Sequence, residues 1–321
     1  MSELNLIIPG LIWGEVDDLE YILHGAKFDA ITKIIAKSKK TDYDFSYSDL
    51  IYGHDFSDNK LSLAENYAKK LGLPVGCNYI LLEPTNLRAD RDRLLIAESD
   101  ILQLNEVESL NLLSILNQHF NQDDVYFSYI NEHLWLAQLP FSVKHFKTCP
   151  IVDIIGCNID EYLPSGDNYL LLHRILNEVQ MLFHNFELEA KREEEGLVAV
   201  NSVWFWDKKY KQLPSEINQI IKPERGSFFV ETDFINSNAA ILIDKAYFPL
   251  CYQDSFAWVE NLNLLDRHLG TVLGLLQSGK IRYLKLWVPQ KDKTIVLHLN
   301  KLSLYKFWKK GNYKQLVTDF Q

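Results

Sequence analysis

Apolar positions along the chain follow two different periods, which together predict an α/β protein. Short, nearly continuous apolar runs predict buried strands at 4–8, 79–82, 201–206, 227–232, 239–243, 281–288 and 294–299. Apolar residues spaced three and four apart predict helices at 17–23, 28–37, 61–71, 105–120, 169–186 and 254–276. The central part adds a more polar strand at 87–97 and a hairpin-like pair of strands at 125–130 and 133–139. Asn105 with Glu108 three residues later is a capping-box pattern for the helix that begins there.

The order of these elements indicates a sheet core interrupted by an insertion. Strands alternate with helices at both ends of the chain, whereas the middle mixes short strands and helices. We therefore predict an α/β core, with its sheet flanked by helices, formed by residues 1–82 and 151–321. A smaller inserted α+β subdomain is expected at 83–150. The polar and aromatic residues 43–58 are expected at the surface.

The composition and net charge of the chain indicate which classes of binding partner to expect. The 321 residues include 47% hydrophobic ones, enough for a sizeable core, and carry a net charge of −10. An acidic surface repels nucleic acids and anionic lipid headgroups, so we expect neither as a partner. The four cysteines show no metal-binding or redox spacing, and the first residues lack the pattern of a secretory signal. A cytoplasmic location is the resulting expectation.

The helix predicted at 169–186 carries a polar stripe beside its apolar face. His173, Asn177, Gln180 and His184 recur at intervals of four, three and four residues. Imidazole and amide groups on one face can line a pocket for an anion or a sugar hydroxyl. The alternative is that these residues are the solvated face of the helix. No dinucleotide-binding, nucleophile-elbow or zinc-protease motif accompanies them.

A dense run of charge, Arg88 to Arg93, interrupts an otherwise apolar context. In an extended strand, alternate residues point to opposite faces, so the run could form an ion-pair ladder on an exposed sheet. Alternatively, Arg88 and Arg91 bind a carboxylate or phosphate, which the guanidinium fork suits.

Three segments together carry a resemblance to a known family. In residues 87–120, a strand with the sequence Arg-Ala-Asp is followed by a helix that begins with acidic residues. Residues 148–166 contain Thr-Cys-Pro-x-x-Asp and then Leu-Pro-x-Gly. Residues 184–206 end in Val-Trp-Phe-Trp. In this order they resemble the archaeal-type, cofactor-independent phosphoglycerate mutases of the alkaline phosphatase superfamily. The same segments are also similar to a bacterial family labelled phosphoglycerate-mutase-like or RpfE-type regulatory protein. The resemblance implies an alkaline-phosphatase-like sheet core.

The chain departs from that family where the family holds its two metal ions. The family's first strand leads into an Asp-Gly metal ligand, but this chain reads Pro9-Gly10, and the family's Pro-His-Asp is replaced at 150–153. The nearest late candidates, Asp266 and His268, are two apart on a predicted helix and so face different sides. The Gly after the family's aromatic strand is Asp207 here. We therefore expect no metal and no cofactor.

The resemblance, together with the helix stripe, implies that a set of polar residues faces a phosphate ester. This set comprises Arg88, Arg91, Asn177, Gln180, His184, Arg192 and Asn201. The expected function is non-catalytic or regulatory binding of a small phosphorylated metabolite. Two alternatives stay open: an active mutase or phosphohydrolase with divergent metal ligands, and a protein–protein interaction module that uses the aromatic residues of 43–54.

Overall fold

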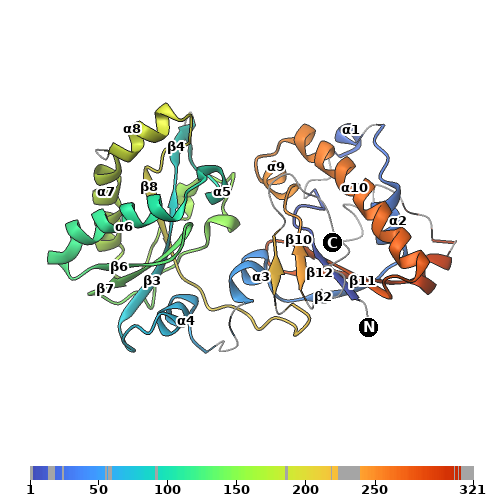
Figure 1. Cartoon of the computed structure of the whole chain (residues 1–321), viewed down its shortest axis with the longest axis horizontal. Helices are drawn as coiled ribbons and strands as arrows, with labels where there is room; N and C mark the ends of the chain where they lie inside the picture. Colours follow the sequence, from blue (N-terminus) through green and yellow to red (C-terminus); the bar gives the residue numbers. More distant parts are fainter. Residues whose placement is uncertain are drawn as a thin grey trace. The chain divides into compact units, whose positions relative to one another are not determined.

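The computed structural model divides the chain into two compact units (Figure 1). It describes residues 3–13, 19–23, 25–54, 56, 60–90, 93–184, 187–217, 219–222, 239–306, 308–309 and 311. Met1–Asp55 and Lys211–Gln321 form one unit, here called the terminal unit, and Phe56–Tyr210 form the other, the middle unit.

The terminal unit is built on a mixed six-stranded sheet. Its strands are β1 (Glu3–Ile7), β2 (Lys39–Tyr43), β9 (Ile220–Ile221), β10 (Ala240–Leu242), β11 (Tyr283–Pro289) and β12 (Thr294–Asn300). Their order across the sheet is β2-β12-β11-β1-β10-β9. The four strands from β11 to β9 are parallel, and β12 and β2 are antiparallel to their neighbours. The carboxyl ends of four strands therefore meet at one edge.

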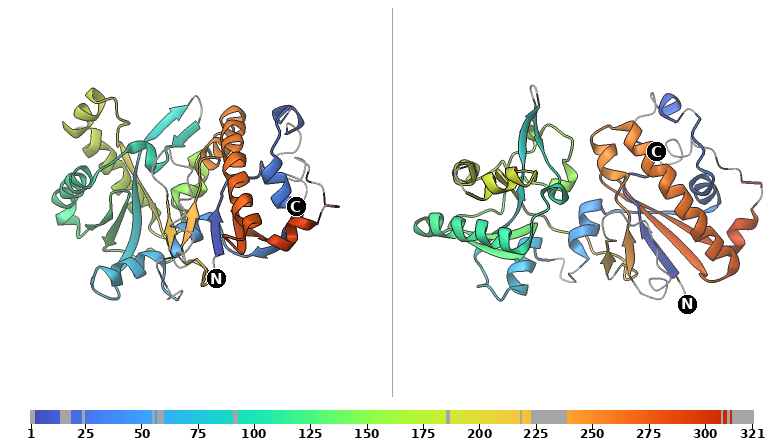
Figure 2. Two further views of the ribbon diagram at one scale, coloured as in Figure 1. Left: turned by 45° about the vertical axis from the view of Figure 1, so that its right-hand side comes forward. Right: turned by 45° about the horizontal axis from the view of Figure 1, so that its top comes forward.

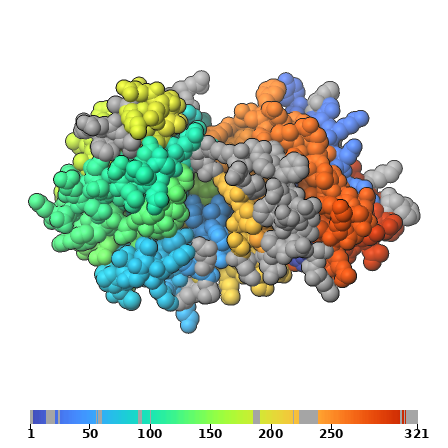
Figure 3. Space-filling model, viewed as in Figure 1, coloured from blue at the N-terminus to red at the C-terminus, as the bar shows by residue number. Residues whose placement is uncertain are grey.

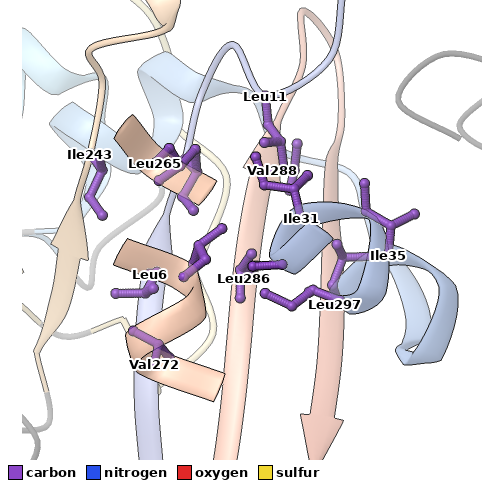
Figure 4. Close-up of a cluster of buried hydrophobic side chains, with 14 of the residues drawn as sticks. Leu6, Leu11, Ile31, Ile35, Ile243, Leu265, Val272, Leu286, Val288 and Leu297 are labelled. Atoms are coloured by element: carbon purple, nitrogen blue, oxygen red, sulfur yellow. The ribbon is translucent and has the colours of Figure 1, made fainter. Parts of the chain in front are cut away.

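The terminal unit has several helices, and two of them cover one face of this sheet. The helices are α1 (Leu19–Ile22), α2 (Asp29–Lys37), α3 (Tyr47–Gly53), α9 (Tyr247–Cys251), α10 (Ser255–Ser278) and the short 3₁₀ turn η5 (Lys301–Tyr305). The long helix α10 and α2 run over the strands in both views of Figure 2. Leu6, Leu286 and Leu297, from three neighbouring strands, point toward residues of these two helices (Figure 4). The alternation of apolar residues along the strands thus buries one face under amphipathic helices.

The opposite face of the sheet buries aromatic residues. Trp287 is 1% exposed and donates its indole N–H to the Asn5 side chain at 3.0 Å. Its ring stacks on Phe45, and Tyr47 is buried as well. For the described residues of 43–58, the expectation of a surface segment was therefore wrong, because Phe45 packs on Trp287 and Tyr47 packs on Tyr247 instead of facing solvent.

The middle unit is built on antiparallel strands. These are β3 (Asn78–Thr85), β6 (Tyr126–Asn131), β7 (Leu134–Leu139) and β8 (Ser202–Trp206), in the order β6-β7-β3-β8, with a separate pair formed by β4 (Leu87–Asp90) and β5 (Arg93–Ile96). The helices are α4 (Leu63–Lys70), α5 (Ser99–Leu102), α6 (Glu106–Phe120), α7 (Tyr169–His184) and α8 (Glu187–Glu194). Three 3₁₀ turns complete it: η1 (Asn121–Asp123), η2 (Ile151–Asp153) and η3 (Ile159–Glu161).

Helices α6 and α7 bury their apolar faces against this sheet. Leu112, Leu116, Val179 and Phe183 share one cluster of buried side chains with residues of β3, β7 and β8. Helix α4 contacts β3 and β7. Both α4 and α6 reach the surface of the unit, in cyan and green in Figure 3. The predicted capping box of α6 is confirmed by the reciprocal bonds of its N-cap residue.

Two further expectations differ from the structure. The middle unit spans 56–210 instead of 83–150, because β8 pairs with β3 and α7 packs on the same sheet. The single strand expected at 87–97 is a hairpin, since β4 and β5 pair antiparallel. The strand expected at 227–232 lies outside the described residues.

The predicted class is confirmed: the chain is a mixed α/β protein with a mixed sheet flanked by helices. In the parts that the structure describes, no helix is both long and apolar enough to span a bilayer.

Candidate functional site

The polar stripe predicted on α7 is present on that helix, but its members have different surroundings. Gln180 donates a hydrogen bond to the Ser202 hydroxyl at 3.2 Å, which ties α7 to β8. The His173 ring lies 3.0 Å from the carbonyl oxygen of Pro164. Asn177 and His184 are exposed. The stripe therefore mixes inter-element contacts with solvent-facing side chains.

Arg192 is completely buried, and the protein itself satisfies its guanidinium. Its Nη1 donates to Glu108 Oε1 at 2.8 Å, which forms a buried ion pair. Its Nε and Nη2 donate to the carbonyl oxygen of Val198, and Nη2 also donates to that of Leu102. A guanidinium with these partners joins α8 to the start of α6 and has little capacity left for a ligand.

Asn201 is also held by the backbone. Its Oδ1 accepts from the Leu87 N–H and its Nδ2 donates to the Leu87 carbonyl, both at 2.8 Å. This pair of bonds fixes the start of β4, the strand that carries the exposed Arg88. Arg91 lies outside the described residues. Among the described members of the predicted set, Gln180, Arg192 and Asn201 are thus engaged by other parts of the protein. Arg88, Asn177 and His184 are exposed.

The carboxyl edge of the parallel strands is where the resemblance implies two metal ions. Gly10 follows β1 with a φ of +74°, and a Cβ there would lie 2.6 Å from the Cα of Tyr247. The Gly10 carbonyl accepts the indole N–H of Trp258 at 2.7 Å. Gly10 corresponds to the Gly of the family's Asp-Gly pair, and the position of the Asp, which is the metal ligand, is occupied by Pro9, whose side chain carries no ligand atom.

Two acidic groups of this unit have partners within the protein. Asp244, after β10, pairs with Lys222 at 3.1 Å. Asp266 accepts the N–H of Ile31 at 2.8 Å and so caps the first turn of α2. Among the residues that the structure describes, no three His, Cys, Asp or Glu side chains are grouped as metal ligands. The side chains of this edge that the structure describes do not fit a two-metal centre.

A pocket of the middle unit gathers several charged and polar side chains. Its volume is about 620 Å³. Its lining comes from the start of α4, β3, the segment 143–148 and the residues after β8: Lys60, Leu61, Ser62, Glu65, Cys77, Asn78, Tyr79, Ile80, Val143, Lys144, Phe146, Thr148, Asp207, Lys208 and Lys209. The lining contains four lysines and two acidic residues, and we call this site the lysine pocket. In a chain with a net charge of −10, this is a local excess of positive charge.

Asp207 connects the walls of the lysine pocket. Its Oδ1 accepts the N–H of Ala64 at 3.0 Å, in the first turn of α4, and the N–H of Lys208 at 2.9 Å. The Thr148 hydroxyl bonds to the Asp207 backbone on both sides, accepting from its N–H at 3.0 Å and donating to its carbonyl at 3.2 Å. One residue thus fixes the ends of β8, α4 and the segment 143–148.

The environment of Asp207 changes its acidity. The residue is half-buried, but its carboxyl group is surrounded by protein atoms. This burial, with a smaller contribution from the negative charge of Glu65, raises the pKa of Asp207 to about 7 from the ordinary 3.8. Hydrogen bonds from Ser62, Ala64 and Lys208 oppose the shift. Asp207 is therefore a carboxyl group that titrates near neutral pH at the wall of a cationic pocket.

Sequence reasoning did not assign a role to Asp207, although it carried a signal. Asp207 stands where the family has Gly after its aromatic strand, and two lysines follow it directly. Lys60 and Lys144 come from distant segments, so the sequence gives no indication that they meet the other two.

Comparisons with known proteins support a relation to phosphoglycerate mutases over part of the sequence. No family model matches the chain. Over 57 residues it is 39% identical to a protein of Geobacter sulfurreducens described as a probable 2,3-bisphosphoglycerate-independent phosphoglycerate mutase. That match covers 18% of this chain and only 14% of the relative's length.

Two solved structures are similar over nearly the whole chain. One is a cofactor-independent phosphoglycerate mutase of Thermoplasma acidophilum, with 12% identity and a TM-score of 0.40, covering 98% of this chain and 95% of that one. The other is a protein of Pyrococcus horikoshii, with 10% identity and a TM-score of 0.48, covering 98% and 91%. One sequence relative and one structural neighbour thus carry the enzyme name that the sequence resemblance indicated, whereas the relation to RpfE-type proteins stays a prediction.

Proposed function

We propose that this chain is a non-catalytic binding protein, and that its middle unit holds a small phosphorylated metabolite in the lysine pocket. The observation that carries the proposal is the gathering of four lysines around one pocket of an acidic chain. The proposal keeps the predicted ligand class but moves the site away from the residues that the resemblance implied.

The chemistry of the pocket suits a compact dianion. Lysine ammonium groups are point charges with three donors each, and they bind phosphate oxygens without demanding a fixed geometry. A volume of about 620 Å³ lies within the range of small-molecule sites and leaves space for a short carbon skeleton beside the phosphate. Tyr79 and Phe146 provide aromatic surface on the same lining.

The non-catalytic part of the proposal is supported by the sheet edge of the terminal unit. Phosphoryl transfer on a metal centre needs ligands that hold and orient the ions. Where the family has its first Asp ligand this chain has Pro9, and the Asp266 carboxylate is engaged in capping α2. The interaction-module alternative loses its proposed surface, because Phe45 and Tyr47 are buried.

Calorimetric titration with 3-phosphoglycerate in the presence of EDTA tests the proposal. We expect saturable binding to the wild-type protein and at least tenfold weaker binding to the double variant Lys144→Gln, Lys209→Gln, because two exposed lysines of the lining are neutralised. The matched control is Lys69→Gln, an exposed lysine of α4 that is not part of the lining. Equal affinity in the double variant, or binding that needs a divalent metal, would contradict the proposal.

A further inference from the structure

We infer that the lysine pocket binds its anion together with a proton on Asp207, so that the pocket holds a dianion more tightly below neutral pH than above it. This inference rests on the proposed function and adds a regulatory property to the same site. The inference concerns the protonation of Asp207 and does not depend on which phosphorylated metabolite occupies the pocket.

The geometry places the Asp207 carboxyl where its charge matters. Asp207 is a lining residue of the pocket, and its buried carboxyl accepts the Ala64 and Lys208 N–H groups at 3.0 and 2.9 Å. The carbonyl of Lys208 accepts in turn from the Leu63 N–H at 2.9 Å. This double connection to the start of α4 prevents the carboxyl from swinging away when an anion enters. A fixed carboxylate beside a bound dianion is a repulsive pair, whereas a fixed carboxylic acid is neutral.

Protonation of Asp207 and binding of an anion therefore favour each other. Burial already brings the pKa of this carboxyl to about 7 in the free protein. A dianion in the pocket adds negative charge nearby and raises the pKa of Asp207 further, as any like charge does. By linkage, the same coupling makes the protonated protein the better anion binder.

Several other titratable or polar groups also line the pocket. Ser62 and Glu65 lie at the start of α4, and Cys77 and Tyr79 lie on β3 or just before it. Lys144 and Thr148 belong to the segment 143–148. The remaining charged residues of the lining are Lys60, Lys208 and Lys209. One histidine lies close to the lining: His145 is exposed and pairs with Asp167 at 2.8 Å.

The test uses inorganic sulfate, because its charge does not change between pH 6 and pH 8.5, unlike that of a phosphate ester. Titration calorimetry measures its dissociation constant at both pH values for the wild type, Asp207→Asn and His145→Gln. If a bound dianion raises the pKa of Asp207 by about one, wild-type affinity is about five- to tenfold lower at pH 8.5 than at pH 6. We expect Asp207→Asn to lose this pH dependence and His145→Gln to keep it.

A second readout does not depend on the folding of the variant. Titration of the wild type at pH 7 in two buffers of different ionisation enthalpy gives the number of protons taken up, and we expect about 0.4 per sulfate. Sulfate binding with no pH dependence and no proton uptake would overturn the inference while leaving the proposed function standing. A pH dependence that survives in Asp207→Asn but is lost in His145→Gln would also overturn it. If neither sulfate nor 3-phosphoglycerate bound at any pH, the proposed function and the inference would fail together.

Discussion

Replacing Asp207 by Asn should stabilise the protein increasingly as the pH rises. Because the folded pKa of Asp207 is raised, the native state retains a proton that the unfolded chain releases above its ordinary pKa. The wild type therefore loses stability as the pH rises from about 4 to about 7, and the loss is complete above pH 7. At 1.36 kcal/mol per pKa unit, the step from 3.8 to about 7 corresponds to about 4 kcal/mol as an upper limit.

The Asn side chain keeps the shape and the acceptor for the Ala64 N–H but never ionises. Urea unfolding of both proteins at intervals from pH 5 to pH 8 measures the difference in their free energies of unfolding. We expect the variant to gain about 2 kcal/mol on the wild type over this range. A difference that stays constant or falls with pH would refute the buried-acid interpretation, whatever its absolute value, because a simple packing defect does not titrate.

Three further predictions concern stability, each measured by urea unfolding. Arg192→Met leaves Glu108 without its buried partner and should lower the free energy of unfolding by about 3–5 kcal/mol. The control Arg88→Met, at an exposed position of β4, should change it by no more than about 0.5 kcal/mol. Similar losses in the two variants would contradict the structural role of Arg192. Gly10→Ala should lower the free energy of unfolding by at least about 3 kcal/mol, because the added Cβ would meet the Tyr247 backbone. Gly72 has a similar φ of +70° but open space around it, so Gly72→Ala should lower it by about 1 kcal/mol. Asp266→Ala removes a cap of α2 and should cost about 1 kcal/mol, while the exposed Asp292→Ala should change little; no difference between them would count against the cap.

Local patterns predicted most elements of the fold because their causes are local. The spacing of Leu172, Val179 and Phe183 defined α7, and Asn105 with Glu108 marked the start of α6, as the structure confirms. The extent of the middle unit was not predictable in this way. It depends on β8 pairing with β3, more than a hundred residues earlier in the chain, and hydrophobic periodicity does not specify pairing partners.

The candidate site was harder to predict for the same reason. The sequence shows that Arg192 is charged, but not that Glu108 and two carbonyl oxygens surround it in the core. The lysine pocket joins side chains from separate segments, and the raised pKa of Asp207 arises from burial, which exists only after folding. Charge type could be read from the sequence, whereas burial and convergence could not.

Phosphorus NMR of 3-phosphoglycerate mixed with the protein tests the central claim most directly, since one spectrum reports both binding and turnover. The account predicts that the ligand signal broadens saturably in EDTA, that this broadening is lost with Lys144→Gln, Lys209→Gln, and that no 2-phosphoglycerate or inorganic phosphate forms when Mg²⁺ or Zn²⁺ is added. Conversion of the ligand after metal addition, or a signal unaffected by the protein, would contradict it.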